Sequence, residues 1–143
     1  MKELNIDTGL VTYNLNDAVQ VTFNPTDSKF GERLFNIFEE LDKKQNEYIE
    51  NVNSKKNSKE LFEYSRELDE EMRGYLFTLF DMDIVTPLIG DINVFALAGG
   101  LPIWANILTA LVDEMDAAVT ANNELSKKRV DKYTKKYTKK YTK

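Results

Sequence analysis

The sequence predicts an α+β fold, mostly α, in which an N-terminal β-hairpin packs on a bundle of three principal helices. The first 23 residues gather β-branched and aromatic residues into two short runs, as strands do, and apolar residues then recur every three or four positions along three long stretches. With 143 residues, 42% of them hydrophobic and 30% charged, the chain suits one folded domain. We expect a single α-rich domain over residues 1–126 and a separate basic segment over residues 127–143.

The hairpin is predicted from residues 10–15 and 18–23. Val19, Val21 and Phe23 share one face of the second strand, so that face can pack on a core. Asn16 and Asp17 between the strands suit a tight turn. Because an isolated hairpin is marginal in water, these strands should lie against the helices.

Two amphipathic helices are predicted next, near residues 28–53 and 58–80. Pro25 keeps Asn24 out of the helical region, and Thr26 or Asp27 can cap the first helix. The polar connection between the helices predicts an antiparallel α-hairpin.

A long uncharged stretch follows, over residues 92–112. Its length would suit a membrane span, but Gly99, Gly100 and Pro102 interrupt it, so we interpret it as buried core. We expect a short buried helix over residues 92–98 and a last helix near residues 102–124. Trp104 should be buried on that helix, beside Leu76, Phe95 and Leu108.

The C-terminal segment differs sharply in charge from the rest of the chain. Residues 127–143 hold nine basic residues and one acid, a net charge of +8, whereas residues 1–126 hold ten basic and 23 acidic residues, a net charge of −13. A Tyr-Thr-Lys-Lys unit repeats from Tyr133, which would put Tyr133, Tyr137 and Tyr141 on one side of a helix. Residues 130–143 should therefore form a helix or an extended arm.

This segment is the candidate partner-binding site. Its basic side chains should be attracted to an acidic protein surface, either of another copy or of a client, and tyrosine supplies apolar area. Nucleic-acid binding is disfavoured because the body carries the same sign of charge as the polyanion, and a merely solvated segment remains the alternative. The candidate residues are Tyr133, Lys135, Lys136, Tyr137, Lys139 and Lys140.

Composition also bears on catalysis. The chain has no Cys and no His, which excludes thiolate chemistry, disulfides and histidine-based triads. Asp113 and Asp116 lie one helical turn apart and could bind a hard cation, but a solvated acidic face is the better interpretation. Gly99-Gly100 lacks the spacing of a phosphate-binding loop. We therefore expect no enzyme activity, no catalytic residue, no cofactor and no metal.

Several segments carry a resemblance that extends over nearly the whole chain. They are Val21 to Asp27 (VTFNPTD), Leu68 to Arg73 (LDEEMR), Gly90 to Trp104 (GDINVFALAGGLPIW) and the Lys-Tyr-Thr-Lys-Lys-Tyr end. Together they are similar to short proteins encoded in the tail-gene clusters of long-tailed phages and prophages of Gram-positive bacteria. The place of that family in its clusters resembles that of tail assembly chaperones, small helical proteins that coat the tape-measure protein and help tail-tube subunits to polymerise.

The resemblance implies a non-catalytic protein that binds tape-measure or tail-tube proteins, with homo-oligomers possible. Residues 1–7 lack the apolar run of a signal peptide, so we expect the host bacterial cytoplasm and no membrane. Two other functions stay open. One is a structural virion component of the tail or connector, and the other is a small phage-encoded inhibitor whose acidic body occupies a nucleic-acid channel of a host defence enzyme.

Overall fold

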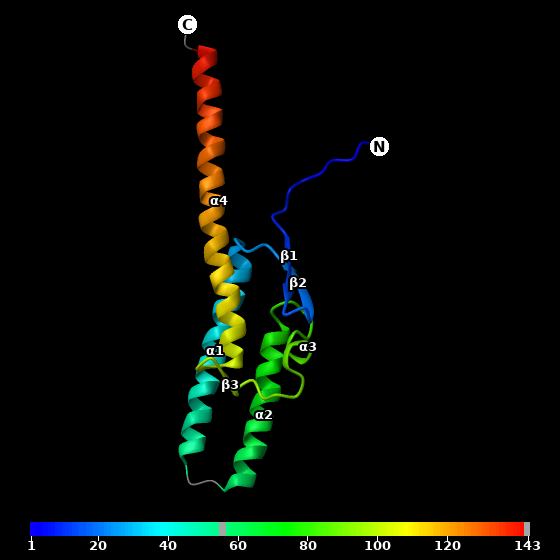
Figure 1. The fold of residues 1–143 in the computed structure, drawn as a ribbon, viewed down its shortest axis with the longest axis vertical. Helices are drawn as coiled ribbons and strands as arrows, with labels where there is room; N and C mark the ends of the chain where they lie inside the picture. Colours follow the sequence, from blue (N-terminus) through cyan, green and yellow to red (C-terminus); the bar gives the residue numbers. More distant parts are fainter. Residues whose placement is uncertain (55–56, 142–143) are drawn as a thin grey trace.

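In the computed structural model, the backbone is described for residues 1–54 and 57–141, and the side chains are described up to Asp131. The elements follow the order β1 (Val11–Leu15), β2 (Val19–Phe23), α1 (Ser28–Asn53), α2 (Ser58–Phe77), α3 (Val85–Ile89), β3 (Leu97–Ala98), β4 (Leu101–Pro102) and α4 (Ile103–Tyr141). The predicted fold class, an N-terminal hairpin followed by helices, is confirmed. Figure 1 shows an elongated molecule with the α1–α2 hairpin at one end and the end of α4 at the other.

The N-terminal hairpin forms as predicted. β1 and β2 pair antiparallel, with Val11 opposite Phe23 and Leu15 opposite Val19. Three residues connect the strands, and two of them, Asn16 and Asp17, adopt positive φ, 54° and 55°. The Ala18 amide closes the turn by donating a hydrogen bond to the Leu15 carbonyl oxygen at 2.9 Å. Val21 and Phe23 on the inner face are buried, and Thr22 on the other face is exposed.

Polar caps fix where α1 and α2 begin. The Asp27 side chain accepts a hydrogen bond from the Lys29 amide at 3.0 Å, and Asn57 accepts one from the Glu60 amide at 2.9 Å. Each cap satisfies a donor that a helix leaves unpaired in its first turn. The bounds of α1 agree with the prediction, and α2 ends three residues earlier than predicted.

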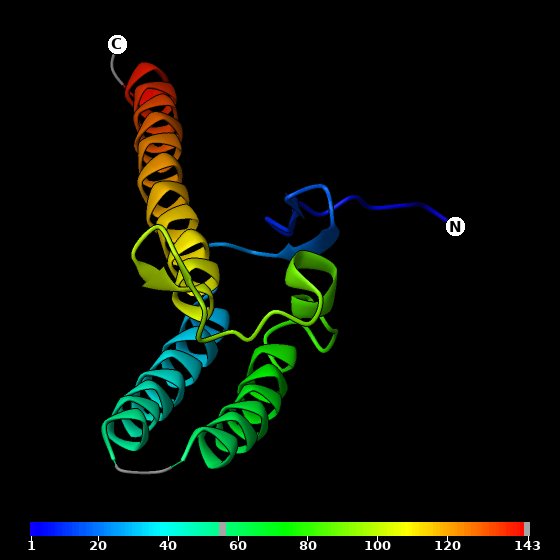
Figure 2. The same cartoon turned by 60° about the horizontal axis from the view of Figure 1, so that its bottom comes forward.

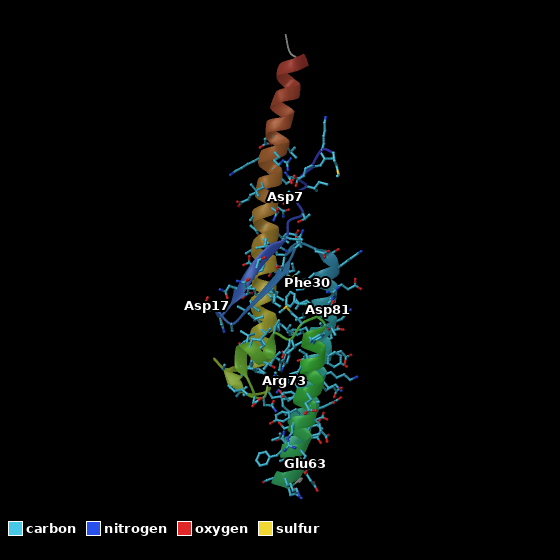
Figure 3. The ribbon with its side chains drawn as sticks, turned by 90° about the vertical axis from the view of Figure 1, so that its right-hand side faces the viewer. Asp7, Asp17, Phe30, Glu63, Arg73 and Asp81 are labelled. Atoms are coloured by element: carbon cyan, nitrogen blue, oxygen red, sulfur yellow. The ribbon has the colours of Figure 1, made fainter. Side chains whose placement is uncertain are left out.

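The core lies where β2, α1, α2 and the first half of α4 meet. Phe30 of α1 stacks on Phe23 of β2 with ring centroids 4.4 Å apart, and Phe80 lies against both rings. Figure 3 shows Phe30 directed into this centre, with Asp17 at the tip of the hairpin and Glu63 near the far end of α2. Leu41, Met72, Leu76 and Leu108 extend the same core with no side-chain exposure.

The predicted helix over residues 92–98 is wrong. This segment forms turns that end in β3, which pairs with β4. The Asn93 side chain accepts a hydrogen bond from the Phe95 amide at 2.9 Å, and a side chain bonded to the backbone two residues ahead favours a turn over a helix. Val94 and Phe95 are buried as expected, but Leu97 is 71% exposed.

The predicted end of the last helix near Glu124 is also wrong, because α4 continues to Tyr141. Neither Gly nor Pro occurs after Pro102, so no residue of that kind interrupts the helix. Lysines near its C-terminus also interact favourably with the helix dipole. The helix crosses position 126/127 without a break, so the two-part division remains a prediction drawn from charge.

Candidate protein-contact surface

The end of α4 extends beyond the body of the molecule. α4 runs antiparallel to the first half of α1, since Trp104 contacts Phe38 while the Met115 Cε atom lies 3.2 Å from a Cβ built on Gly31. Beyond this contact Figures 1 and 2 show α4 continuing past the start of α1. We call residues 119–141 the arm. At a rise of 1.5 Å per residue its 23 residues extend about 35 Å.

The base of the arm is held from two sides. On one side α4 passes close to Gly31 of α1, where a larger side chain would displace the end of the Met115 side chain. On another side of α4, the Tyr13 hydroxyl of β1 donates a hydrogen bond to Glu114 Oε1 at 3.0 Å. Burial raises the pKa of Tyr13 to about 12, and the bond to Glu114 adds to the rise. These contacts hold α4 against α1 and β1 just before the arm begins.

Exposure rises where the body ends. Met115 and Ala118 are still half-buried, whereas every residue from Val119 to Asp131 is exposed. Among them Leu125 is 57% exposed and Val130 is 58% exposed. Residues 7–9 border an open groove of about 600 Å³ together with Ala121 and Arg129 of this stretch. The arm therefore leaves apolar side chains in water.

The face of α4 that packs on the core continues along the arm. The buried residues Trp104, Leu108 and Leu111 and the half-buried Met115 are followed at spacings of three, four or seven residues by positions 119, 126, 130, 133 and 137. These spacings keep all the positions on one side of a helix. Val119, Val130 and two tyrosines lie on this side of the arm, together with the polar residues Asn122, Ser126 and Arg129. The apolar stripe is thus interrupted by polar residues on the arm, but it is longer than the body that covers its first half.

All six candidate residues lie on the arm. The structure places Tyr133, Lys135, Lys136, Tyr137, Lys139 and Lys140 within α4, which selects the helix from the two forms predicted for this segment. Their side chains lie outside those that the structure describes, so their role as partner-binding residues remains a prediction. Thr142 and Lys143, at the end of the segment, lie outside the described residues.

The charge of α4 changes sign along its length. Residues 103–126 carry four acids, Asp113, Glu114, Asp116 and Glu124, and no base. Residues 127–141 carry eight bases and one acid, Asp131. Asp113 and Asp116 are exposed, and among the described residues no cluster of three or more acids, His or Cys could hold a metal ion. The N-terminal part of α4 is therefore acidic, and its C-terminal part is basic.

Two of the other acids, Asp69 and Asp83, stabilise the fold. Asp69 Oδ1 accepts a hydrogen bond from the Val94 amide at 2.7 Å, and its Oδ2 pairs with Arg73 Nε at 3.0 Å. The Asp83 side chain accepts bonds from the Val85 and Thr86 amides at the start of α3. Hydrogen bonds from Thr86 lower the pKa of the Asp83 carboxyl. Contacts within the fold therefore account for the positions of Asp69 and Asp83, and no bound ligand is needed to explain them.

Sequence reasoning missed the role of Arg73. Its guanidinium donates to the carbonyl oxygens of Gly90 and Ile92, both at 2.8 Å, as well as to Asp69. It thereby joins α2 to the irregular segment before β3. The spacing of Asp69 and Arg73, four residues apart on a helix, was the available signal. The carbonyl partners could not be read from the sequence.

A second surface feature is an apolar groove of about 450 Å³ between the hairpin turn, α3 and α4. Leu15, Leu88, Ile103 and Ile107 border it, and Asn106 supplies an amide. None of the residues that border it is ionisable. The groove offers apolar contact to a side chain or helix.

Comparison with known proteins identified no relative: no family model, curated protein or solved structure matches the chain. Within the residues that the structure describes, no helix combines the length and apolar character needed to cross a membrane.

Proposed function

We propose that the chain is a non-catalytic assembly protein that binds other proteins through the arm of α4. The single observation that carries this proposal is the arm itself, a basic helix that extends beyond the core while its apolar stripe continues. Stable proteins bury most such stripes, and an uncovered one marks a contact surface. The proposal needs no metal and no cofactor.

Within this class we propose a tail assembly chaperone-like role in a long-tailed phage or prophage of a Gram-positive bacterium. Its clients would be the tape-measure protein, the tail-tube protein or both, in the host bacterial cytoplasm. Support comes from the resemblance carried by the Gly90 to Trp104 segment and the other segments quoted with it. A chaperone of a long helical client also needs exposed surface and a means of linking copies. The arm is suited to linking copies.

The aromatic side chains exposed on the α1–α2 hairpin are the proposed binding site for the client. Phe35 and Phe38 of α1 are 60% and 41% exposed, and Phe62 and Phe77 of α2 are 69% and 46% exposed. Aromatic side chains contribute much of the binding energy at protein interfaces, so these four are the proposed anchors for the client.

Co-expression with the products of the neighbouring genes, followed by a pull-down on the tagged chain, tests this role. We expect a tape-measure or tail-tube protein to be retained, and retention to fall at least tenfold in a Phe62→Ser, Phe77→Ser variant. Glu63→Ser on the same helix is the matched control, since it is exposed and polar already. Retention of neither tail protein by the folded wild-type chain would overturn the tail-assembly role.

A second experiment, on purified virions, distinguishes a chaperone from a structural virion component. A chaperone leaves the particle, so mass spectrometry of purified virions should not detect the chain. Detection at a stoichiometry comparable with the tail-tube protein would favour the structural component instead.

A further inference from the structure

We propose that residues 4–6 of a second copy of this chain lie in the apolar groove between the hairpin turn, α3 and α4, as an extended strand beside β1. This contact uses neither the arm nor the exposed phenylalanines, so it goes beyond the proposed function. Two features of one chain lead to it: a segment that leaves apolar side chains in water, and a groove whose shape and chemistry suit them.

The N-terminal segment carries the exposed apolar side chains. Residues 1–10 form neither helix nor strand, and all of them are exposed. Leu4 is 84% exposed and Ile6 is 80% exposed. In an extended chain these two side chains lie on the same face, about 7 Å apart, and Asn5 lies on the other face. Residues 4–6 thus offer an uncharged strand with one apolar face.

The apolar groove is the matching surface. Its volume is about 450 Å³, equal to about 15 water molecules at about 30 Å³ each, so it has room for the four-carbon side chains of both Leu4 and Ile6. None of the residues that border it is ionisable, so a charged side chain would lose hydration there without gaining a counter-charge. Aliphatic side chains gain by leaving water.

The groove also lies beside an unpaired strand edge. β1 and the turn contribute Asn14, Leu15 and Asn16 to its border, whereas β2 contributes no residue. Within the part of the chain that the structure describes, β1 pairs with β2 alone, so the edge of β1 that faces the groove has no strand beside it. An extended segment can pair with such an edge through its backbone while alternate side chains enter the groove. This favours an extended occupant over a helix.

The segment does not reach the groove of its own chain. Figure 3 places Asp17 at the turn of the hairpin and Asp7 beyond its other end, and the groove lies at the turn. The Thr8 carbonyl oxygen accepts a hydrogen bond from Asn24 Nδ2 at 3.0 Å, which holds the chain beside the end of β2. Figure 1 shows the segment leading away from the body from there. A second copy can supply the segment in this form.

Cysteine crosslinking between two differently tagged full-length chains tests the contact, because the chain contains no natural Cys. One chain carries Asn5→Cys, between the two apolar residues of the segment, and the other carries Ala110→Cys at the border of the groove. A short bis-maleimide reagent should join the two chains. Adding Leu4→Ser and Ile6→Ser to the first chain should lower the yield at least tenfold, and the fold should be unaffected because both residues are exposed.

Two control variants report whether the crosslink is specific. Glu3→Ser in the first chain changes an exposed residue on the same side of the strand as Asn5, so it should leave the yield unchanged. Ala121→Cys in the second chain, in place of Ala110→Cys, should give little product. It is also exposed and lies on nearly the same side of α4, but about 17 Å further along the helix.

The product also identifies the occupant of the groove. In a chain that carries both Asn5→Cys and Ala110→Cys, product at twice the 16.5 kDa mass of one chain supports a second copy. Product within single chains alone would mean that each segment fills its own groove, which would overturn the contact. Crosslinking of Ala110→Cys to a co-expressed tail protein alone would overturn it in favour of a client.

Failure of this contact is distinguishable from failure of the proposed function. A yield no higher than that of Ala121→Cys, or a yield unchanged by Leu4→Ser with Ile6→Ser, would overturn the contact. If such a chain still retains tail proteins in the pull-down, the tail-assembly role stands. A specific crosslink in a chain that retains none of them would support the contact and overturn that role.

Discussion

At the scale of single residues, Trp104 joins the last helix to the first. Its ring is 3% exposed and meets Phe38 edge to face, with centroids 5.7 Å apart, and its indole Nε1 donates to Gln45 Oε1 at 2.9 Å. The predicted burial is confirmed, and Leu76, Phe95 and Leu108 belong to the same buried cluster. The indole bond to Gln45 could not be predicted, because it depends on how α1 and α4 lie side by side.

We expect Trp104→Ala to lower the free energy of unfolding by about 3 to 5 kcal/mol, because it leaves a cavity where α1 and α4 meet. Urea unfolding followed by circular dichroism measures this loss. Trp104→Phe is the matched control, since it keeps an aromatic ring but loses the bond to Gln45, and it should cost less. Equal stability of the alanine variant and the wild type would contradict the structure around Trp104.

We expect the chain to lose stability at alkaline pH because of Tyr13. Its pKa in the folded chain, about 12, lies above the ordinary value of 10.0, so the folded state holds the phenol proton more tightly than the unfolded chain does. The contribution from this residue is fully present below pH 10 and is lost as the pH rises from about 10 to 12. Stability of the wild type should fall more steeply over this range than that of Tyr13→Phe. Parallel curves for the two proteins would contradict the raised pKa of the half-buried Tyr13 phenol.

At the scale of elements, the segments with clear periodicity were predicted well and the irregular one was not. The apolar period of 3.6 residues and the caps at Asp27 and Asn57 define α1 and α2 from local sequence alone. Residues 92–98 are apolar without a period, and long-range bonds from Asp69 and Arg73 decide their form. Pattern reasoning does not capture bonds of that kind.

Substitutions of Arg73 test how α2 is joined to the irregular segment before β3. Arg73→Ala removes hydrogen bonds from a charged donor to the carbonyl oxygens of Gly90 and Ile92, so we expect a loss of about 2 to 3 kcal/mol in urea unfolding. Arg73→Lys should recover only part, since an ammonium lacks the planar fork that reaches both carbonyls. Arg66→Ala, exposed on the same helix, is the control and should change little. A loss of equal size in both alanine variants would contradict this role.

At the scale of the whole molecule, the sequence predicted a charged C-terminal segment but not the geometry that makes it a candidate surface. Composition alone indicated a boundary at residue 127, where the charge changes sign. The structure places that change in the middle of one helix, which contacts Gly31 and Tyr13, far away in the sequence, before the arm begins. The apolar stripe can be traced from the core into the arm only once α4 is known to be one unbroken helix.

Amide hydrogen exchange along α4 tests the central claim, that the arm is a protein-contact surface, most directly. The chain is compared at low micromolar concentration, at high micromolar concentration and with a bound tail protein. We expect residues 119–131 to exchange quickly in the dilute protein and at least tenfold more slowly in one or both associated states. Residues 103–115 should stay protected throughout, because one face of this stretch packs on the core. Equally rapid exchange of residues 119–131 in all three samples would contradict the account.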